Sequence, residues 1–239
     1  MNISQSGRIP LNRARVLESA VAVADAAGLE ALSMRSLADR LGVVPMALYK
    51  HVANKDELID GMIDVVIGEI APPLAGVDWR PAVRARILSA RDALLRHPWA
   101  SSAMEQRSTP TATVLVYMDS VIGMFLAGGF SADLTHHCMH ALGSRMFGFS
   151  QELYRGGQGP TPDGEAVRMM AMAYPNIVTV AAKADHDQGT TVGAGCDDQF
   201  EFEFALDLVL DGFELLRQRN WRSADRHMAW TRGDFDHLT

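Results

Sequence analysis

Apolar residues recur at helical spacing along almost the whole chain, and this period limits the possible fold more than any other feature of the sequence. Between 11 and 27 the repeating positions are Leu17, Ala20, Val21 and Ala24. Gly28 follows them, where it can stop a helix. Aromatic residues make up only 7% of the chain, and no strand-like alternation or internal repeat stands out. The sequence therefore predicts an all-α protein.

Breaks in this pattern divide the chain into a small head and a larger body. Further helices are predicted over about 34–41, 45–51, 54–70, 80–96, 111–127, 132–155, 165–183 and 199–219. The run APPLAG at 71–76 interrupts the pattern and is the predicted domain junction. We therefore expect a small N-terminal domain over 1–55, a linking helix over about 54–70, and a larger C-terminal domain over 71–239.

Composition narrows the functional class and the compartment. No apolar run approaches the roughly 20 residues needed to cross a bilayer, and the first ten residues are polar. Cys138 and Cys196 are the only cysteines, which gives no disulfide framework. We therefore expect a cytoplasmic protein. The sequence shows no nucleophile motif, phosphate loop or set of metal ligands, so we expect no enzyme activity and no cofactor.

Charge is distributed unevenly along the chain, although its net value is −7. Residues 1–55 carry seven Lys and Arg against four Asp and Glu, a balance of +3, so the rest carries −10. A basic head on an acidic body is expected where one end of a protein meets phosphates. The asymmetry is modest and would not identify a DNA-binding protein alone.

The segment Ser33–His51 has the pattern of a helix-turn-helix. Ser33 can cap a helix over 34–41, and Gly42 can take the positive φ that the corner requires. Pro45 can begin a short second helix, because the N–H that it lacks has no partner at that position. This order of support helix, tight turn and reading helix is the one that enters the major groove of DNA.

Side chains in and around the reading helix are suited to DNA. Met46 and Ala47 would face base edges, where a thymine methyl group offers apolar contact. Lys55 begins the next helix, whose N-terminus already favours a phosphate. The residues predicted to contact DNA are Arg35, Pro45, Met46, Ala47, Tyr49, Lys50, His51 and Lys55. Tyr49 could equally pack inside the head, and Lys50 could be a solvated charge.

The head also resembles the DNA-binding domain of the tetracycline-repressor (TetR) family over Leu11–Ile63. The matching runs are LNR at 11–13, AAG at 26–28, LSMRSLA at 32–38, LGV at 41–43 and LYKHVANKDEL at 48–58. The last run joins the reading helix, the turn and the next helix in a fixed register, which makes it the most specific of the five.

The resemblance implies a role for each matching position. It assigns base contacts to Pro45, Met46, Ala47 and Tyr49, and phosphate contacts to Arg35, Tyr49, His51 and Lys55. The tetracycline repressors have polar side chains where this chain has Pro45 and Ala47. We therefore expect a different operator, read with fewer direct hydrogen bonds to bases.

The body resembles the corresponding C-terminal domain of the family more weakly, through Asp78-Trp79, Gly129-Phe130-Ser131 and the 147–152 region. The resemblance implies a homodimer that forms through helices at 132–154 and 200–216. An apolar face within the second of these helices supports the assignment. It is formed by Phe202, Leu206, Val209, Phe213 and Leu216. A helix buried within one chain would show the same pattern, and this alternative stays open.

A small-molecule effector is expected in an apolar pocket of the body with a few polar groups. The candidate residues are Trp99, Met104, Glu105, Tyr117, Met118, Val121, His140, Phe147, Met169, Met172 and Tyr174. Each of them could equally be ordinary core. In the family register Glu105 replaces a magnesium-binding histidine, and Glu152 takes the position of a metal-associated acid. We therefore do not expect magnesium–tetracycline as the effector.

The sequence supports one leading hypothesis and leaves rivals open. The leading one is a homodimeric repressor that binds a palindromic operator and is released by an effector, with the linking helix as the lever. The first rival is an enzyme or metal sensor built on His136, His137 and His140, of which the first and last share a helix face. The second is an activator or nucleoid-type protein without a ligand, for which the body would have no closed cavity.

Overall fold

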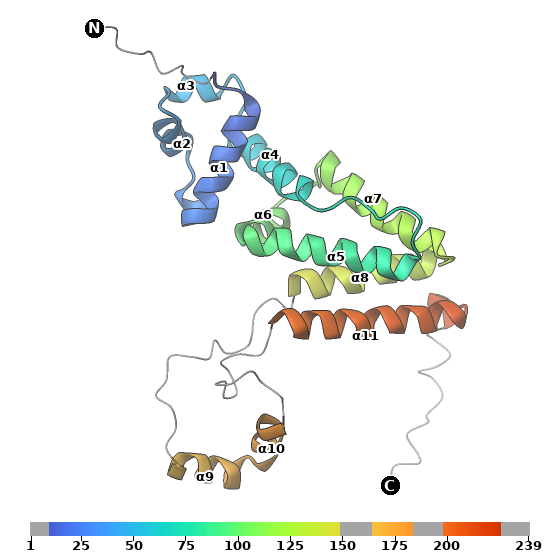
Figure 1. The fold of residues 1–239 in the computed structure, drawn as a ribbon. Helices are drawn as coiled ribbons and strands as arrows, with labels where there is room; N and C mark the ends of the chain where they lie inside the picture. The colour runs from blue at the N-terminus through green and yellow to red at the C-terminus, as the bar shows by residue number, and fades with distance from the viewer. Residues whose placement is uncertain (1–9, 149–163, 184–197, 226–239) are drawn as a thin grey trace. The chain divides into compact units, whose positions relative to one another are not determined.

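In the computed structural model of the protein, the residues described are 10–148, 164–183 and 198–225. They are helical, with no strand in these three ranges, which confirms the all-α prediction (Figure 1). The chain divides into two compact units, 1–135 and 136–239.

The first unit contains seven α-helices and the start of an eighth within its described residues. They are α1 (Arg13–Ala27), α2 (Met34–Leu41), α3 (Pro45–Leu48), α4 (Lys55–Gly68), α5 (Trp79–Arg96), α6 (Trp99–Glu105), α7 (Ala112–Ala127) and α8 (Ala132–Gly148), with a 3-10 turn η1 (Leu29–Ala31) after α1. The second unit contains the rest of α8, then α9 (Gly164–Ala173), α10 (Pro175–Lys183), α11 (Asp198–Gln218) and a 3-10 turn η2 (Ser223–Asp225).

The head is the bundle formed by α1, α2, α3 and the first turns of α4. Its core is apolar and closely packed, with Val16, Leu37 and Leu58 all 0% exposed. Helices α1 and α4 approach closely at Gly61, where an added Cβ would lie 2.6 Å from a methyl carbon of Leu17. The absent side chain therefore sets how near the linking helix lies to the head.

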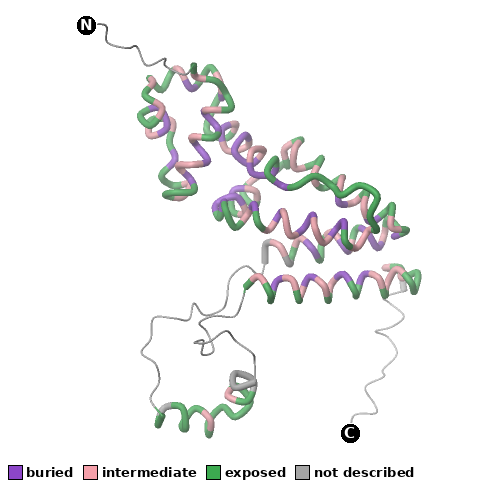
Figure 2. The backbone as a smooth tube through the Cα atoms, in the orientation of Figure 1, coloured by how far each residue is buried: buried purple, intermediate pink, exposed green. Residues whose placement is uncertain are grey.

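The helix α4 continues from the head and packs against α5, α6 and α7 within the same unit. Buried residues recur along α4 and α5 (Figure 2). Three aromatic rings also pack together within this group. The ring centroid of Trp79 lies 5.7 Å from that of Phe125 and 4.7 Å from that of Phe130, and the two phenylalanine centroids are 5.1 Å apart. One helix thus belongs to both the head and the core of the body.

After the linking helix, one predicted helix is divided and one observed helix was not predicted. The predicted helix 165–183 is two helices, because Pro175 has no N–H to donate and its ring disfavours a helical residue before it. The helix α6 was not predicted, because its seven residues WASSAME are too few to show an apolar period.

Several predicted features lie outside the described residues: Glu152, Cys196, the C-terminal end of the helix 132–155, and most of the loops 156–164 and 185–198. Among the helices that are described, none is both long enough and apolar enough to cross a membrane.

Candidate functional site

The helix-turn-helix at 33–51 is built from short-range hydrogen bonds. Ser33 and Ser36 form a reciprocal capping box, in which the N–H of Ser36 donates to Ser33 Oγ at 3.0 Å and the N–H of Ser33 donates to Ser36 Oγ at 2.9 Å. Gly42 ends α2 with φ 67°. The N–H of Val43 then donates to the carbonyl of Ala38 at 3.0 Å, which closes a Schellman-type turn. The corner predicted from the sequence has this geometry.

The helix α3 is shorter than predicted, since it ends at Leu48 rather than His51. The Leu48 carbonyl accepts from the N–H of His51 at 2.8 Å and of Val52 at 3.1 Å, which tightens the chain into a turn. Leu48 and Val52 are both buried, with exposed fractions of 0% and 1%. These two anchors draw residues 49–51 into the turn before α4 and so end the helix early.

The outward face of α3 is apolar and open to solvent. The exposed fractions are 68% for Val44, 72% for Met46 and 45% for Tyr49. Large apolar side chains at such exposure, next to one another on a short helix, are typical of a surface that binds a partner. Tyr49 is therefore not a residue of the head core, which was the alternative left open by the sequence.

Four further predicted contact residues, three of them cationic, precede or follow this face along the chain. Arg35, Lys50 and Lys55 are exposed and His51 is half-buried. No ion pair joins any of the four to another side chain in the described part of the chain. The charges of Arg35, Lys50 and Lys55 are therefore available to phosphates.

Two contacts fix the start of α4 directly after the reading helix. Asn54 Oδ1 accepts from the N–H of Glu57 at 2.8 Å, and the carboxylate of Glu57 accepts from the N–H of Ala53 at 2.7 Å. Asn54 thus caps α4 as predicted, while Glu57 reaches one residue further back than in the standard capping box. The cap therefore fixes the backbone at Lys55, the first residue of α4.

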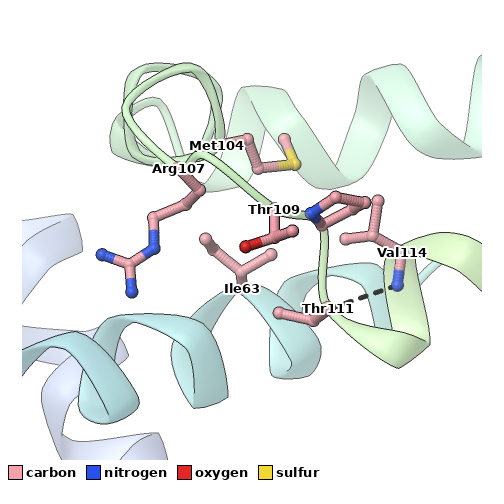
Figure 3. Close-up of a pocket in the computed structure, with 7 residues that line it drawn as sticks. Ile63, Met104, Arg107, Thr109, Thr111 and Val114 are labelled. Carbon is pink, nitrogen blue, oxygen red and sulfur yellow. Dashed lines mark hydrogen bonds between the residues drawn. The ribbon is translucent and has the colours of Figure 1, made fainter.

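A small pocket opens between α4, the end of α6 and the loop that leads into α7 (Figure 3). Its volume is about 160 Å³. Ile63 enters it from α4, and Met104 from α6. Its lining is Ile63, Met104, Arg107, Thr109, Pro110, Thr111 and Val114. A pocket of this size holds a small group or one part of a larger ligand, since drug-sized ligands occupy about 300–1,000 Å³.

The wall of this pocket is bonded to the first turns of α4. Arg107 lies 2.9 Å from Asp56 Oδ1 and 2.7 Å from Asp60 Oδ1. The contacts with Asp60 and then Asp56 raise the pKa of the Arg107 guanidinium above its ordinary value. Thr111 donates to Asp64 Oδ1 at 2.6 Å. A change in this wall therefore acts on the helix that follows the reading helix.

The predicted effector residues are dispersed over the structure. Met104 lines the pocket; Trp99 and Val121 are buried, while Glu105, Met118, His140, Met169, Met172 and Tyr174 are exposed. The backbone of Phe147 is described within α8, but its side chain is outside the described atoms. The assignment of these side chains to an effector stays a prediction.

Tyr117 lies beneath a buried arginine that the sequence reasoning did not select. The guanidinium carbon of Arg86 is 4.8 Å from the centre of the Tyr117 ring. Burial raises the pKa of Tyr117 to about 12, opposed by the charge of Arg86. Burial also lowers the pKa of Arg86, which donates to the carbonyls of Ile70 and Ala71 just after α4. A buried charge has no periodic signature in a sequence, so only the fold could indicate it.

The helix α11 has two apolar faces, and this corrects one sequence interpretation. Phe202, Leu206 and Phe213, predicted for the dimer interface, are 5%, 0% and 7% exposed in the single chain. They are core residues of the single chain, while Val209 and Leu216 of the same predicted face are half-buried. The exposed apolar face is a different one: Phe200 at 62%, Phe204 at 54%, Leu208 at 57% and Leu215 at 46%.

The histidines on α8 do not form a metal centre in the described structure. The ring centroids of His136 and His140 are 4.6 Å apart, and His137 packs edge-on against Trp221 at 5.3 Å. No group of three or more His, Cys, Asp or Glu side chains that could hold a metal ion is found among the described residues. The cluster thus lacks the additional ligands that a zinc site needs.

A helix-turn-helix head with an exposed reading face, joined by one helix to a helical body, defines a DNA-binding transcriptional regulator. The chain belongs to the tetracycline-repressor family. The family model for bacterial regulatory proteins of the TetR family matches residues 16–62, and the model for the tetracycline repressor-like C-terminal domain matches residues 72–217. The family resemblance seen in the sequence is confirmed, and the protein is a ligand-responsive transcriptional regulator.

Individual relatives agree with the family. The HTH-type transcriptional repressor DrrR1 of Streptomyces coeruleorubidus is 30% identical over 88% of this chain and 80% of its own length. An HTH-type transcriptional regulator of Saccharopolyspora erythraea is 36% identical, but that match spans only 50% of this chain and 51% of the relative. The structure of ActR from Streptomyces coelicolor in complex with (S)-DNPA has a TM-score of 0.60 and 25% identity, covering 86% and 98% of the two chains.

Proposed function

We propose that the protein is a homodimeric repressor, whose two heads read the half-sites of a palindromic operator and whose body releases the DNA when an effector binds. The observation that carries this proposal is the exposed apolar face of α3, next to which the chain carries the exposed cations Arg35, Lys50 and Lys55, none in an ion pair among the described residues. Phosphate contacts position such a head, and side chains on the reading helix specify the sequence. Residues 1–55 and the linking helix would act on DNA, and residues 71–239 would bind ligand and partner.

The chemistry of the reading face indicates what it recognises. Met46 presents a thioether and Ala47 a methyl group, and Pro45 has no N–H. Apolar contact with thymine methyl groups is the direct readout left to such side chains. We therefore propose an operator that is recognised through thymine methyls and phosphates, with Tyr49 adding a hydroxyl group at the edge of the face.

The route from effector to operator is proposed to run through the pocket wall. Arg107 and Thr111 line the pocket, and they bond to Asp56, Asp60 and Asp64 on α4. A ligand that displaces this wall would pull on the first three turns of α4, which follow the reading helix. Only a difference in the ligand's affinity for the two positions of α4 could drive release.

A second copy of the chain is the proposed occupant of the exposed face of α11. Phe200, Phe204 and Leu208 recur at a spacing of four residues, so they form one stripe along the helix. A helix that is apolar on two faces needs two packing partners, and the chain itself supplies one. The second would be the same stripe of the other subunit in a symmetric four-helix arrangement.

The effector is proposed to be an apolar organic molecule larger than the pocket described here, with one group seated beside Met104. ActR, which shares the fold, has been solved in complex with (S)-DNPA. Glu105 is exposed, so nothing in its position supports a magnesium–tetracycline effector.

The reading helix is tested by Tyr49→Ala, with Tyr174→Ala as a matched control, because both tyrosines are exposed, at 45% and 55%. The probe is a duplex selected from a random library by the wild-type protein. We expect Tyr49→Ala to weaken binding roughly tenfold or more, the size of one lost specific contact, and the control to bind within twofold. Equal binding by both variants would disprove the assignment of α3.

Thymine recognition is tested on the same duplex by replacing single thymines with deoxyuridine. Burial of one methyl group contributes about 0.8 kcal/mol, so each contacted thymine should change the affinity of the wild-type protein about fourfold. The Met46→Ala variant should be insensitive to the replacement at the base that Met46 contacts. If no thymine in the duplex responds, recognition does not rest on methyl groups.

A further inference from the structure

A buried imidazole lies between two carboxylates where the head meets the body, within the first unit. His97 directly follows α5, and its side chain is 9% exposed. Its Nδ1 is 2.8 Å from Asp25 Oδ1, and its Nε2 is 3.1 Å from Glu69 Oε1. Asp25 belongs to α1 of the head, and Glu69 is the residue that ends α4. One side chain therefore touches both the head and the linking helix.

Each carboxylate is held in place by a second donor. Trp99 Nε1 donates to Asp25 Oδ1 at 2.7 Å. Arg96 donates to Glu69 Oε2 from Nη2 at 2.7 Å and from Nε at 3.1 Å. The charged groups that face His97 and its partners are thus Asp25 from α1, Glu69 from the end of α4 and Arg96 from α5, while α6 supplies the neutral Trp99.

The Glu69 carboxylate can only accept a hydrogen bond from the His97 ring. Burial alone would raise the pKa of Glu69, but hydrogen bonds from Arg96 and His97 outweigh it and lower that pKa below its ordinary value. Glu69 therefore has no proton to donate to the ring at neutral pH, and Nε2 must supply the hydrogen of their contact.

Only one form of the ring fits both contacts. Neutral imidazole carries one N–H and one lone pair, so one of its nitrogens would direct a lone pair at a carboxylate oxygen. The doubly protonated ring donates from both nitrogens, and each bond is then charge-assisted. The geometry of the site is complementary to the imidazolium form.

We propose that His97, Asp25 and Glu69 form a protonation-dependent latch, in which the His97 imidazolium ties α1 and the end of α4 to the α5–α6 corner and makes operator affinity depend on pH. His97 is a positioning residue, since it acts on DNA only through the placement of the head. The operator readout rests on the proposed function, whereas the latch itself does not.

The sign of the pH effect follows from linkage. The proton that completes the latch stabilises the latched form, so the stabilisation is present while both ring nitrogens are protonated and is lost when the ring gives up a proton at higher pH. A latched head loses less orientational freedom on binding DNA, so we expect tighter operator binding on the acid side.

The latch is tested first without DNA. In the full-length protein with nitrogen-15-labelled histidines, we expect the NMR signals of His97 to report two protonated ring nitrogens at pH 6. The melting temperature of the wild type should fall between pH 6 and 8.5 by more than that of His97→Gln. His136→Gln, which removes an exposed histidine on α8, should retain the wild-type slope. Asp25→Asn keeps the histidine and should lose the same pH dependence as His97→Gln.

The operator readout uses the duplex selected above. The ratio of the Kd of His97→Gln to that of the wild type should be at least about fivefold at pH 6, the usual lower size of a coupling between sites. It should fall to within twofold at pH 8.5.

The two sets of measurements separate two kinds of failure. A neutral His97 ring at pH 6, or equal pH slopes of melting in the wild type, His97→Gln and Asp25→Asn, would overturn the latch. A ratio of Kd values that is constant or rises with pH would overturn its effect on operator binding. If the wild-type protein bound no duplex, that result would count against the proposed function alone, because the NMR and melting measurements need no DNA.

Discussion

The contacts that shape the head and those that join it to the body differ in their reach along the chain. In the head, Ser33 bonds to Ser36 and Asn54 to Glu57, each at a separation of three residues. Between head and body, Arg107 bonds to Asp56 across 51 residues. The contact of His97 with Asp25 spans 72 residues.

The difference separates recognition from regulation. The bonds that form the caps and the corner of the head lie within the head itself, so they set its local geometry without contacts from the body. The long-range bonds, by contrast, can break while each helix stays intact. Coupling between sites needs elements with two discrete arrangements, and such bonds between helices supply them.

The largest expected effect concerns the body. Phe125 is 0% exposed between the rings of Trp79 and Phe130. Phe125→Ala should lower the free energy of unfolding by about 3–5 kcal/mol, because it removes a buried ring and leaves a cavity. The matched control is the neighbouring Leu126→Ala, since Leu126 is 47% exposed and should change this energy by less than about 0.5 kcal/mol. Urea unfolding at fixed protein concentration gives both values, and similar losses would mean that the three rings are not the core of the body.

The next effect concerns the junction of α1 and α4. Gly61→Val should cost about 1–3 kcal/mol, because its new carbon atoms overlap Leu17 of α1. Gly123 lies in α7 with no atom within 4 Å of an added Cβ, so Gly123→Ala should stabilise the protein by about 0.5–1 kcal/mol. Thermal unfolding of the two variants should shift in opposite directions. A shift in the same direction would show that α1 and α4 do not need the glycine for their approach.

The smallest effect concerns the local bonds of the head. Asn54→Ala removes the cap of α4 and should cost about 1 kcal/mol. Asn54→Ser keeps an oxygen that can accept from the N–H of Glu57, so it should remain close to the wild type. Hydrogen exchange of the first turn of α4 would locate the change. Equal exchange in the two variants would indicate that the turn is held by Arg107 rather than by its cap.

The sequence alone determined the elements whose information is local. The caps Ser33 and Asn54, the corner at Gly42 and the core positions of the head follow from side chains within a few residues of one another. The helical period likewise determined the all-α class, and the run LYKHVANKDEL indicated the family. The sequence did not determine where α3 ends, because Leu48 and Val52 end this helix by packing into the core.

Only the tertiary structure decided which face of α11 is buried and which side chains meet between helices. Phe202 and Phe204 are the same residue type two positions apart, yet one is 5% and the other 54% exposed. Nothing in the local sequence distinguishes them, because burial depends on which neighbour the fold supplies. The same holds for His97, whose two carboxylates come from distant helices. Local bonding made the reading head recognisable in the sequence, while packing between helices created the pocket wall and the latch.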